Sequence, residues 1–393
     1  MGGLAPLADL VSRLAAQQDA MVDLLEALVS SESPSDDPAL LAATTELVAA
    51  RGEALLGRAP ERPASAGAPA LRWTLPASPD VAPDVGPVVV LAHLDTVWPA
   101  GTTGRWPFTV VEDRASGPGA FDMKAGLVQA LFALAELTAP GRVGPAHPEV
   151  VLLVTADEEI GSPAGRALVE EAAQGASAVL VLEASAPGGA FKVARKGVGN
   201  YWLHVTGRAA HAGLEPERGI NALVAAAHLV LALDGLADPV AGTTVTPTLA
   251  RAGSAQNTVP ASASVAVDVR AASTAEQTRV DEALRALTVE GGATVRLEGG
   301  INRPPLEEAM STGLLAAAQR AAARCGFPTL EAARVVGGSD GNFTAALGVP
   351  TLDGLGAVGG GAHAEGEHVL ASTMPGRAAL LAALVAEISR SQG

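Results

Sequence analysis

Short apolar runs alternate with amphipathic stretches along the first half of the chain. The runs have strand length and are bounded by glycine, proline and polar residues, which is typical of buried strands, whereas the longer stretches repeat at helical spacing. Strands are predicted at 87–92, 150–154 and 178–182, and helices at 7–29, 124–138 and 164–173. Strands that alternate with helices favour a largely parallel sheet covered by helices. The segment 59–83, rich in Pro and Ala, is predicted to be a surface loop or a weak hairpin.

The pattern changes near Gly197 and changes back after the Arg303-Pro304-Pro305 stretch. The elements predicted between them run strand, helix, strand, strand, helix, strand, at 200–205, 220–236, 243–252, 262–271, 275–288 and 294–298. This order is the ferredoxin-like arrangement, which makes a compact α+β domain. Helix–strand alternation then resumes, with helices predicted at 312–325 and after Pro375. We therefore expect a mixed, largely parallel α/β domain formed by 1–196 and 307–393, with an inserted ferredoxin-like domain at 197–306.

The length of 393 residues agrees with two domains, because a single hydrophobic core rarely grows that large. Asp and Glu outnumber Lys and Arg by 42 to 26, and the formal charge of −16 argues against nucleic acid or an anionic membrane as a partner. Every apolar stretch of membrane-spanning length is interrupted by charge, Pro or Gly. The one cysteine, Cys325, cannot form an internal disulfide, and the N-terminal stretch lacks the pattern of a secretory signal, so we expect a cytoplasmic location.

Acidic residues and histidines collect where the predicted strands of the larger domain end. They follow these strands, precede the helix at 124–138 or lie near the C-terminus: His93, Asp95, Asp122, Asp157, Glu158, Glu159, Glu183 and His363. Ligands of open α/β sheets bind at the carboxyl ends of the strands, so we expect these side chains to converge. Two imidazoles with several carboxylates suit zinc or a similar divalent ion. A pair of ions that shares one carboxylate would neutralise most of the acidic charge.

Each of these features has a simpler interpretation when it is taken alone. The pair His93 and Asp95 can be a structural hydrogen bond, and Asp122 can be the N-cap of the helix that follows it. The acids at 157–159 can belong to a solvated loop. The metal interpretation depends on all of these side chains lying at one edge of the sheet.

Motifs similar to those of one enzyme family run through nearly the whole chain. They are "AHLDTV", "GAFDMKAG", "TADEEIGS", "TGRAAHAG", "NTVPASASVAVDVR", "GGSDGNF" and "GGGAHAEGEHV". In this order they resemble the co-catalytic zinc metallopeptidases, which include bacterial glutamate carboxypeptidase, acetylornithine deacetylase, succinyl-diaminopimelate desuccinylase and aminoacylases. The stretch "TGRAAHAGLEPERGINALV" is most similar to the glutamate carboxypeptidase branch. The resemblance implies that the inserted domain is a lid and dimerisation domain.

The resemblance also implies two zinc ions, with cobalt or manganese as alternatives, and a role for each site residue. It assigns His93, Asp122 and Glu183 to one ion, and Asp122, Glu159 and His363 to the other. Glu158 would be the general base, and Asp95 would orient His93. In the inserted domain, His211, Asn257 and Arg270 match positions that meet the substrate in family members. We expect Gly338 of the "GGSDGNF" motif to contact the substrate as well.

The function expected from this resemblance is hydrolysis of an amide bond in a small peptide or N-acyl amino acid. The products would include an amino acid with a free carboxylate, and the enzyme would be a homodimer in which His211 reaches the partner's site. The first alternative is a deacylase or desuccinylase of N-acyl amino acids. An alternative of another class is a serine hydrolase, with Ser339 as nucleophile and Asp353 and His363 downstream. That alternative leaves the acids at the strand ends unexplained.

Overall fold

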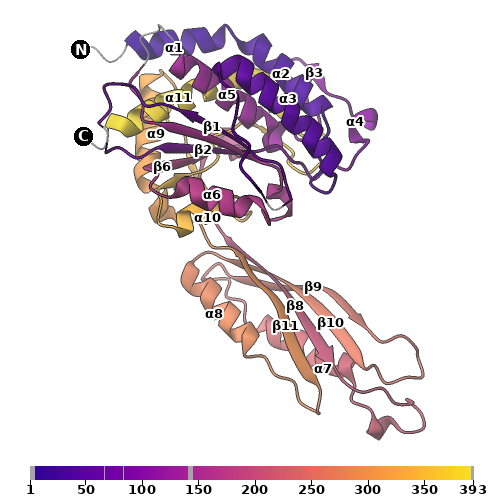
Figure 1. Cartoon of the computed structure of the whole chain (residues 1–393). Helices are drawn as coiled ribbons and strands as arrows, with labels where there is room; N and C mark the ends of the chain where they lie inside the picture. The colour runs from indigo at the N-terminus through magenta and orange to yellow at the C-terminus, as the bar shows by residue number, and fades with distance from the viewer. Residues whose placement is uncertain (1–4, 66, 83, 140–144, 391–393) are drawn as a thin grey trace. The chain divides into compact units, whose positions relative to one another are not determined.

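The computed structural model describes residues 5–65, 67–82, 84–139 and 145–390. The chain forms two compact units, which are described separately (Figure 1). Unit 1 consists of Met1–Ala194, Glu308–Val335 and Ser339–Gly393, and unit 2 consists of Arg195–Glu307 with Val336–Gly338.

A mixed, largely parallel sheet forms the centre of unit 1, as the sequence predicted. Its strands lie in the order β1 (Leu71–Leu75), β5 (Val150–Thr155), β2 (Val88–His93), β6 (Ala178–Val181) and β13 (Thr351–Leu352). Strand β2 runs parallel to β5 and β6, and β13 runs parallel to β6, whereas β1 is antiparallel to β5. The parallel strands therefore end together at one edge of the sheet.

Strand β1 corrects the prediction of a loop or weak hairpin at 59–83. Leu71, Trp73 and Leu75 are almost fully buried and alternate with half-buried Arg72 and Thr74. This is the period of two that a strand requires. The Pro- and Ala-rich flanks hid such a short alternation in the sequence.

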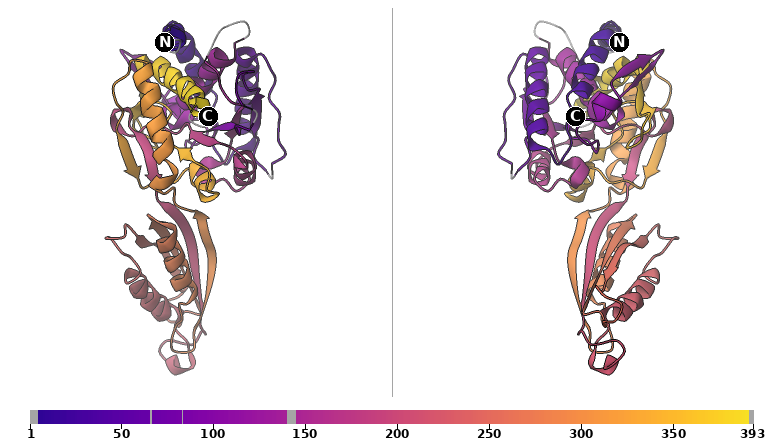
Figure 2. Two further views of the ribbon diagram at one scale, coloured as in Figure 1. Left: turned by 90° about the vertical axis from the view of Figure 1, so that its left-hand side faces the viewer. Right: turned by 90° about the vertical axis from the view of Figure 1, so that its right-hand side faces the viewer.

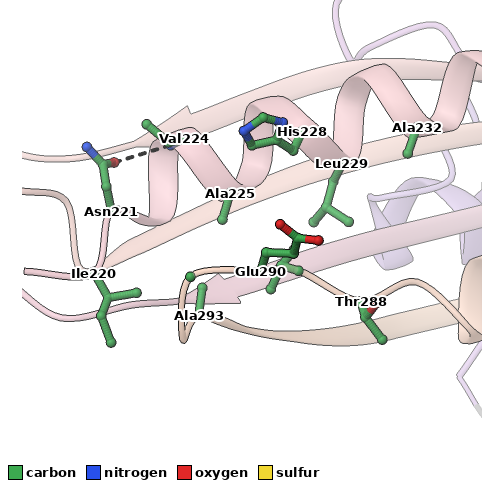
Figure 3. Close-up of a pocket in the computed structure, with 12 residues that line it drawn as sticks. Ile220, Asn221, Val224, Ala225, His228, Leu229, Ala232, Thr288, Glu290 and Ala293 are labelled. Carbon is green, nitrogen blue, oxygen red and sulfur yellow. Dashed lines mark hydrogen bonds between the residues drawn. The ribbon is translucent and has the colours of Figure 1, made fainter.

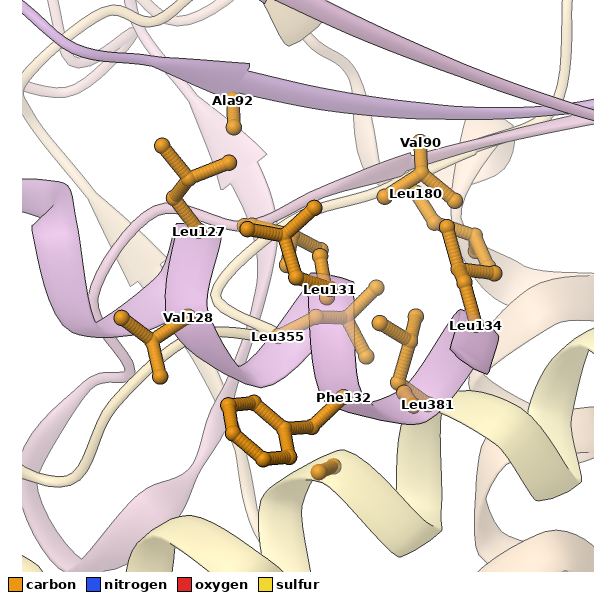
Figure 4. Close-up of a cluster of buried hydrophobic side chains, with 14 of the residues drawn as sticks. Val90, Ala92, Leu127, Val128, Leu131, Phe132, Leu134, Leu180, Leu355 and Leu381 are labelled. Carbon is orange, nitrogen blue, oxygen red and sulfur yellow. The ribbon is translucent and has the colours of Figure 1, made fainter. Parts of the chain in front are cut away.

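The strands of unit 1 direct their side chains alternately to two helical layers. Val88, Val90 and Leu152 belong to the core under α5 (Ala125–Thr138) and α11 (Met374–Arg390). Figure 4 shows side chains of α5, among them Leu127 and Leu131, against this face of the sheet. The intervening residues of the strands pack against α6 (Gly165–Ala173) and α10 (Gly341–Ala346) on the opposite face. The sheet is thus buried on both faces, which explains its continuous apolar runs.

The single helix predicted at 7–29 is two helices, α1 (Ala5–Ala15) and α2 (Gln18–Ser30). The N–H of Gln17 donates to the carbonyl of Leu14 over 3.0 Å, a tighter turn that ends α1. Both helices bury leucines in the core of unit 1. The break lets each helix pack its own apolar face against the core. The helical spacing of apolar residues alone does not predict the position of this break.

The other elements of unit 1 include further helices and short strands around the sheet. They are α3 (Pro38–Leu56), α4 (Thr102–Arg105), α9 (Thr312–Arg324), β3 (Thr109–Val111), β4 (Arg114–Ser116), β7 (Phe191–Arg195), β12 (Ala332–Val335), β14 (Gly359–Gly360) and β15 (His368–Leu370). None of the helices in the described part of the chain combines the length and apolarity that a membrane crossing requires.

Unit 2 has the ferredoxin-like order that the sequence predicted. Its elements are β8 (Gly197–Thr206), α7 (Ala222–Asp234), β9 (Thr244–Ala252), β10 (Ser262–Ala271), α8 (Thr274–Arg285) and β11 (Thr294–Arg303). The strands lie in the order β11-β8-β10-β9, and every neighbouring pair is antiparallel. Helices α7 and α8 cover the same face of the sheet (Figure 2). Tyr201, Val265 and Val280 lie in the core between the two layers.

A glycine in the first turn of α5 provides a test of this packing. A Cβ atom at Gly126 would collide with the carbonyl oxygen of Leu182, which follows β6. Gly126→Ala should therefore lower the free energy of unfolding by about 1–3 kcal/mol, the usual cost of overpacking. Urea denaturation monitored by circular dichroism measures this change.

Gly104 in α4 is the matched control for this substitution. No heavy atom of the described residues, apart from its own stretch of chain, lies within 4 Å of the position that its Cβ would occupy. Gly104→Ala should leave the stability unchanged to within about 1 kcal/mol. Equal effects of the two substitutions would contradict the close approach of α5 to the segment after β6.

Candidate functional site

The acids and histidines predicted from the strand ends gather at the carboxyl edge of the sheet in unit 1. Strand β2 ends at His93, and the short 3₁₀ helix η2 (Glu158–Ile160) follows β5. Glu183 lies two residues beyond the end of β6. Asp122 lies in η1 (Ala120–Lys124), just before α5. His363 lies between β14 and β15.

The carboxylate of Asp122 lies between the two histidines. Its Oδ1 is 3.6 Å from Nε2 of His93, and its Oδ2 is 3.2 Å from Nε2 of His363. Nε2 of His93 is also 3.5 Å from Oε1 of Glu183, and Nε2 of His363 is 3.2 Å from Oε2 of Glu159. The structure thus brings together the two ligand sets named from the sequence, with Asp122 common to both.

The spacing of these atoms fits a pair of divalent cations. Two ligands at ~2.1 Å from a tetrahedral zinc ion lie roughly 3.4 Å apart, and the distances here are 3.2 to 3.6 Å. Among the described residues, Nε2 of His93 and Oε1 of Glu159 are buried without a hydrogen-bond partner. Buried polar atoms normally have partners. The residues therefore fit a metal centre.

The electrostatics of the cluster agree with a requirement for positive charge. Asp122 and Glu159 raise the pKa of His363 to about 10. Burial alone would lower the pKa of His93, but the carboxylates of Asp122, Asp95 and Glu183 outweigh burial and raise it well above its usual range. In the metal-free protein, the protons on the two imidazoles thus supply the positive charge that metal cations would supply. Metal binding must release these protons.

Asp122 does not act as the N-cap of α5. Lys124 occupies the capping position, and Asp122 has the non-helical dihedral angles φ −119° and ψ 95°. Burial raises the pKa of the Asp122 carboxyl, but His363 and His93 lower it far below its usual range. The carboxylate is therefore ionised and directed at the histidines, which rules out the N-cap interpretation.

The three consecutive acids after β5 have different partners. Asp157 is buried and accepts hydrogen bonds from the backbone N–H groups of Ala164 at 2.6 Å and Gly165 at 3.0 Å, at the start of α6. Glu159 lies against His363, and a carboxylate oxygen of Glu158 lies within 4.8 Å of ligand atoms of His93 and Glu183. The solvated-loop interpretation of 157–159 is therefore wrong, and Asp157 is structural.

Asp95 connects both sides of the cluster. Its Oδ1 is 3.3 Å from Nδ1 of His93, which agrees with the orienting role expected from the sequence. The same carboxylate accepts hydrogen bonds from the backbone N–H groups of Glu158 at 3.2 Å and Glu159 at 3.1 Å. Ser35 donates its hydroxyl to Asp95 over 2.7 Å. No pattern in the sequence indicated a role for Ser35, which lies 60 residues before its partner.

Two of the substrate-binding residues expected in unit 2 lie together. The N–H of Ala212, next to His211, donates to the carbonyl of Asn257 over 2.9 Å. Nδ1 of exposed His211 accepts hydrogen bonds from the N–H groups of Gly213 and Leu214, each at 3.1 Å. Since Nδ1 is an acceptor, the proton of the neutral ring is on Nε2, which is a hydrogen-bond donor.

Arg270 lies at the other end of the sheet of unit 2. His211 and Asn257 are near the Ser262 end of β10, whereas Arg270 is eight residues further along this strand. Its guanidinium forms a bidentate ion pair with Asp268, at 2.9 and 3.0 Å. The carbonyl of Gly338 accepts a hydrogen bond from Arg195 over 3.2 Å. The structure thus separates Arg270 from the other two residues.

The environment of Ser339 does not support a serine hydrolase. Ser339 is fully buried, and its hydroxyl donates to Asp353 over 2.6 Å. A serine nucleophile needs a histidine base within hydrogen-bonding distance of its hydroxyl. His363, the histidine of that alternative, lies instead against Asp122 and Glu159.

A hollow of about 620 Å³ lies in unit 2, along α7 and the segment 288–293 that precedes β11 (Figure 3). Its lining is mostly apolar and includes one histidine, His228, and one acid, Glu290. It contains no member of the cluster in unit 1 and no other expected site residue. This hollow therefore gives no support to a second site for the expected chemistry.

The cluster and the fold define a metal-dependent hydrolase of peptide or N-acyl amide bonds. The chain belongs to Peptidase family M20/M25/M40, whose sequence model matches residues 89–387. It is 31% identical over 316 residues to carboxypeptidase G2 of a Pseudomonas species, covering 77% of this chain and 74% of that protein. It is 30% identical over 201 residues to succinyl-diaminopimelate desuccinylase 2 of Shewanella loihica, covering 47% and 52% of the two chains. The expected family is thus confirmed.

Solved structures share the fold over nearly the whole chain. The aminopeptidase PepT of Bacillus cereus matches with a TM-score of 0.74 and 22% identity, covering 94% of this chain and 98% of that one. A metallo-carboxypeptidase of the M20 family from Sulfolobus solfataricus matches with a TM-score of 0.68 and 17% identity, over 94% and 98%. At these identities the likeness shows the fold alone.

The raised pKa of His363 predicts a pH dependence for the stability of the metal-free protein. The imidazolium is stabilised by Asp122 and Glu159 in the fold, and its pKa of about 10 lies above the value of ~6.5 in an unfolded chain. This contribution is fully present below pH ~6.5 and is lost as the pH rises towards about 10. The contribution of His363 to the urea midpoint of the metal-free protein should therefore fall across this window, whereas buried Lys124, whose pKa is lowered to about 7, acts in the opposite direction.

The variant His363→Gln is the control for this effect. Compared with the wild type, its urea midpoint should lack the decrease due to His363, while the contributions of His93 and Lys124 remain in both proteins. The zinc-loaded wild type should show little loss, because the cations then replace the protons. An unchanged slope in His363→Gln would contradict the ion pairs with Asp122 and Glu159.

Proposed function

We propose that the protein is a dinuclear zinc amide hydrolase that releases an amino acid with a free α-carboxylate from a peptidyl or N-acyl conjugate. The observation that carries the proposal is the carboxylate of Asp122 between His93 and His363. The similarity to carboxypeptidase G2 over three quarters of both chains supports a carboxypeptidase-like reaction. The match to the desuccinylase over about half of each chain supports deacylation of N-acyl amino acids as the alternative reaction.

The donor set favours zinc, with cobalt or manganese as substitutes, because imidazole nitrogen and carboxylate oxygen suit these ions. His93, Asp122 and Glu183 would hold one ion, and Asp122, Glu159 and His363 the other. A bound zinc pair supplies Lewis acidity, which polarises the scissile carbonyl and makes a water molecule more acidic.

Glu158 is the proposed general base. Its side chain is only 9% exposed and lies at the cluster, while its neighbour Glu159 is engaged by His363. Asp95 holds the backbone N–H groups of both glutamates and so sets their positions relative to His93. Glu158 would accept the proton of the attacking water and return it to the leaving amine.

His211 is the proposed donor to the oxyanion of the tetrahedral transition state. The backbone N–H groups of Gly213 and Leu214 keep the ring proton on Nε2, so the imidazole can donate without becoming charged. A donor that is already oriented contributes more than one that must rotate into place. Asn257, whose backbone pairs with the His211 segment, would bind the substrate beside it.

Arg270 is the proposed partner of the substrate α-carboxylate, because a guanidinium binds a carboxylate with two parallel hydrogen bonds. In the structure, two nitrogens of the Arg270 guanidinium already donate hydrogen bonds to the carboxylate of Asp268. The substrate must therefore share Arg270 with Asp268 or displace it. The backbone of Gly338 is a further proposed substrate contact, in a segment that Arg195 holds.

The separation of these residues within unit 2 supports the proposal of a homodimer. His211 and Arg270 lie near opposite ends of β10, and eight strand residues span ~26 Å. A dipeptide spans only ~7 Å. One copy of unit 2 therefore cannot present both residues to one small substrate, but two copies can.

The surface of unit 2 also supports association of two chains. Among the described strands, β9 lies at the edge of the sheet and pairs with β10 alone, which leaves its other backbone edge available. On α7 the side chains of Leu223, Val224 and Leu231 are 50%, 50% and 74% exposed. Large apolar side chains grouped on one helix are typical of a contact surface.

Substitution of the two adjacent glutamates separates the proposed base from the proposed ligand. Glu158→Ala should keep two bound metal ions per chain and lose turnover by at least ~10²–10⁴-fold, because the proton acceptor is missing. Glu159→Ala should instead lose one of the two ions. Metal analysis of the purified proteins and turnover of N-acyl amino acids and dipeptides measure the two effects.

The wild type provides the reference for this experiment. A strong chelator should abolish its activity and added zinc or cobalt should restore it, whereas a serine-directed fluorophosphonate should have no effect. Full activity of the metal-stripped protein would overturn the proposed function. A depleted metal site in Glu158→Ala together with two ions in Glu159→Ala would reverse the two roles.

Mixing two inactive variants tests whether His211 acts in the partner's site. A heterodimer of Glu158→Ala and His211→Ala would contain one site with both defects and one site with neither. Co-expression should therefore recover up to about a quarter of wild-type activity per subunit, since half of randomly formed dimers carry one intact site of two. Activity assays of the purified mixture measure this recovery.

Glu158→Ala mixed with Glu159→Ala is the matched control, because both defects affect the cluster of unit 1. Every site in that mixture is defective, so no activity should return. Confirmed heterodimers of Glu158→Ala and His211→Ala without activity would show that His211 does not complete the partner's site.

A further inference from the structure

A buried glutamate that the proposed reaction does not use lies directly behind the Asp122 segment. Glu367 is fully buried and lies four residues after His363. It directly precedes strand β15, which pairs with β4 so that His368 is opposite Ser116. The two segments that carry Asp122 and His363 are therefore connected at this residue.

The side chain of Glu367 accepts hydrogen bonds from four N–H groups. Its Oε1 accepts from the backbone of Phe121 at 2.8 Å and of Asp122 at 2.9 Å. Its Oε2 accepts from the backbone of Gly119 at 3.1 Å and from the indole of Trp98 at 2.9 Å. An ionised carboxylate offers about four lone-pair positions, so these donors nearly saturate it.

The main chain of Glu367 holds the same segment. Its carbonyl oxygen accepts from the hydroxyl of Ser116 at 2.7 Å and from the N–H of Gly117 at 3.3 Å. His363 lies in a turn from Gly361 to Ala364. The backbone N–H of Glu367 donates to the carbonyl of Ala364, the last residue of this turn, over 3.1 Å. His363 has φ of 60°, a conformation that non-glycine residues adopt only when the surroundings hold them in it.

We propose that Glu367 is a positioning residue for the metal centre. It fixes the backbone of Asp122 by a direct hydrogen bond and ties it to the turn that carries His363. The distances from the carboxylate of Asp122 to the two histidines are then set before any ion binds. This inference rests on the proposed metal centre and extends it to a residue that is not a ligand.

The chemistry of the contact explains why a carboxylate is needed. Each of the four partners donates a hydrogen, so the side chain must accept at both oxygens. Glutamine has nearly the same shape, but its NH₂ group would face two N–H donors. One pair of contacts would be lost, and the segment from Gly119 to Asp122 would shift away from the position that suits both ions.

The test compares cobalt binding by metal-free Glu367→Gln and by the wild type. Residues that hold metal ligands in place typically contribute 10–100-fold to metal affinity. We expect Glu367→Gln to bind Co²⁺ about 10–100-fold more weakly, with a changed visible absorption spectrum of the bound ion. Calorimetric titration and the absorption spectrum measure binding independently of activity.

Glu136→Gln is the matched control for the loss of a buried carboxylate. Glu136 is 8% exposed and accepts hydrogen bonds from Arg13 and Gln17, away from the cluster. This variant should lose stability but bind Co²⁺ like the wild type. If Glu367→Gln loses stability in the same way and retains wild-type cobalt affinity and spectrum, the proposal is wrong.

Trp98→Phe keeps the proposal testable if Glu367→Gln does not fold. It removes one of the four donors and leaves the backbone N–H groups of Gly119, Phe121 and Asp122, which donate to the carboxylate of Glu367. We expect a smaller decrease in cobalt affinity in the same direction, and wild-type affinity and spectrum in folded Trp98→Phe would overturn the proposal. A wild type that binds no Co²⁺ would refute the metal centre itself, which separates the two failures.

Discussion

The ionised carboxylate of Asp122 between two imidazoles is the interaction on which the site depends. A buried carboxylate is stable only when positive charge or several hydrogen-bond donors compensate for the lost water. Here one oxygen faces His93 and the other faces His363, so compensation is needed on both sides. Protons on the histidines provide it in the metal-free protein, and the proposed pair of cations would provide it in the working enzyme. The fold and the chemistry are therefore coupled through one side chain.

The nature of their partners divides the acids at the sheet edge into two groups. Asp157, Asp95 and Glu367 accept hydrogen bonds from backbone N–H groups, and Asp95 also faces Nδ1 of His93. Asp122, Glu159 and Glu183 face imidazole nitrogens at distances that suit shared coordination. Acids of the first group define the positions of the loops. Acids of the second group are the proposed metal ligands, and this distinction is visible only in three dimensions.

The sequence predicts much of this because its signals are local. Apolar runs mark β2, β5 and β6, and the residues just beyond them must meet at the carboxyl edge of a parallel sheet. The family motifs then add the assignment of ligands. What the sequence could not predict depends on contacts between distant segments. Ser35 and Glu367 form hydrogen bonds with residues 60 or more positions away in the sequence. Asp268, on the same strand as Arg270, already pairs with its guanidinium. Short β1 was hidden by its Pro- and Ala-rich flanks.

Chemistry and recognition are distributed differently over the chain. Every proposed metal ligand and the proposed base belong to unit 1 and lie together within one copy of that unit. His211 and Arg270, the proposed contacts with the substrate, both belong to unit 2 and lie near opposite ends of β10. A single chain could therefore bind its ions and still lack one end of the substrate site. If both residues serve one substrate, the length of β10 makes the association of two chains a requirement for catalysis.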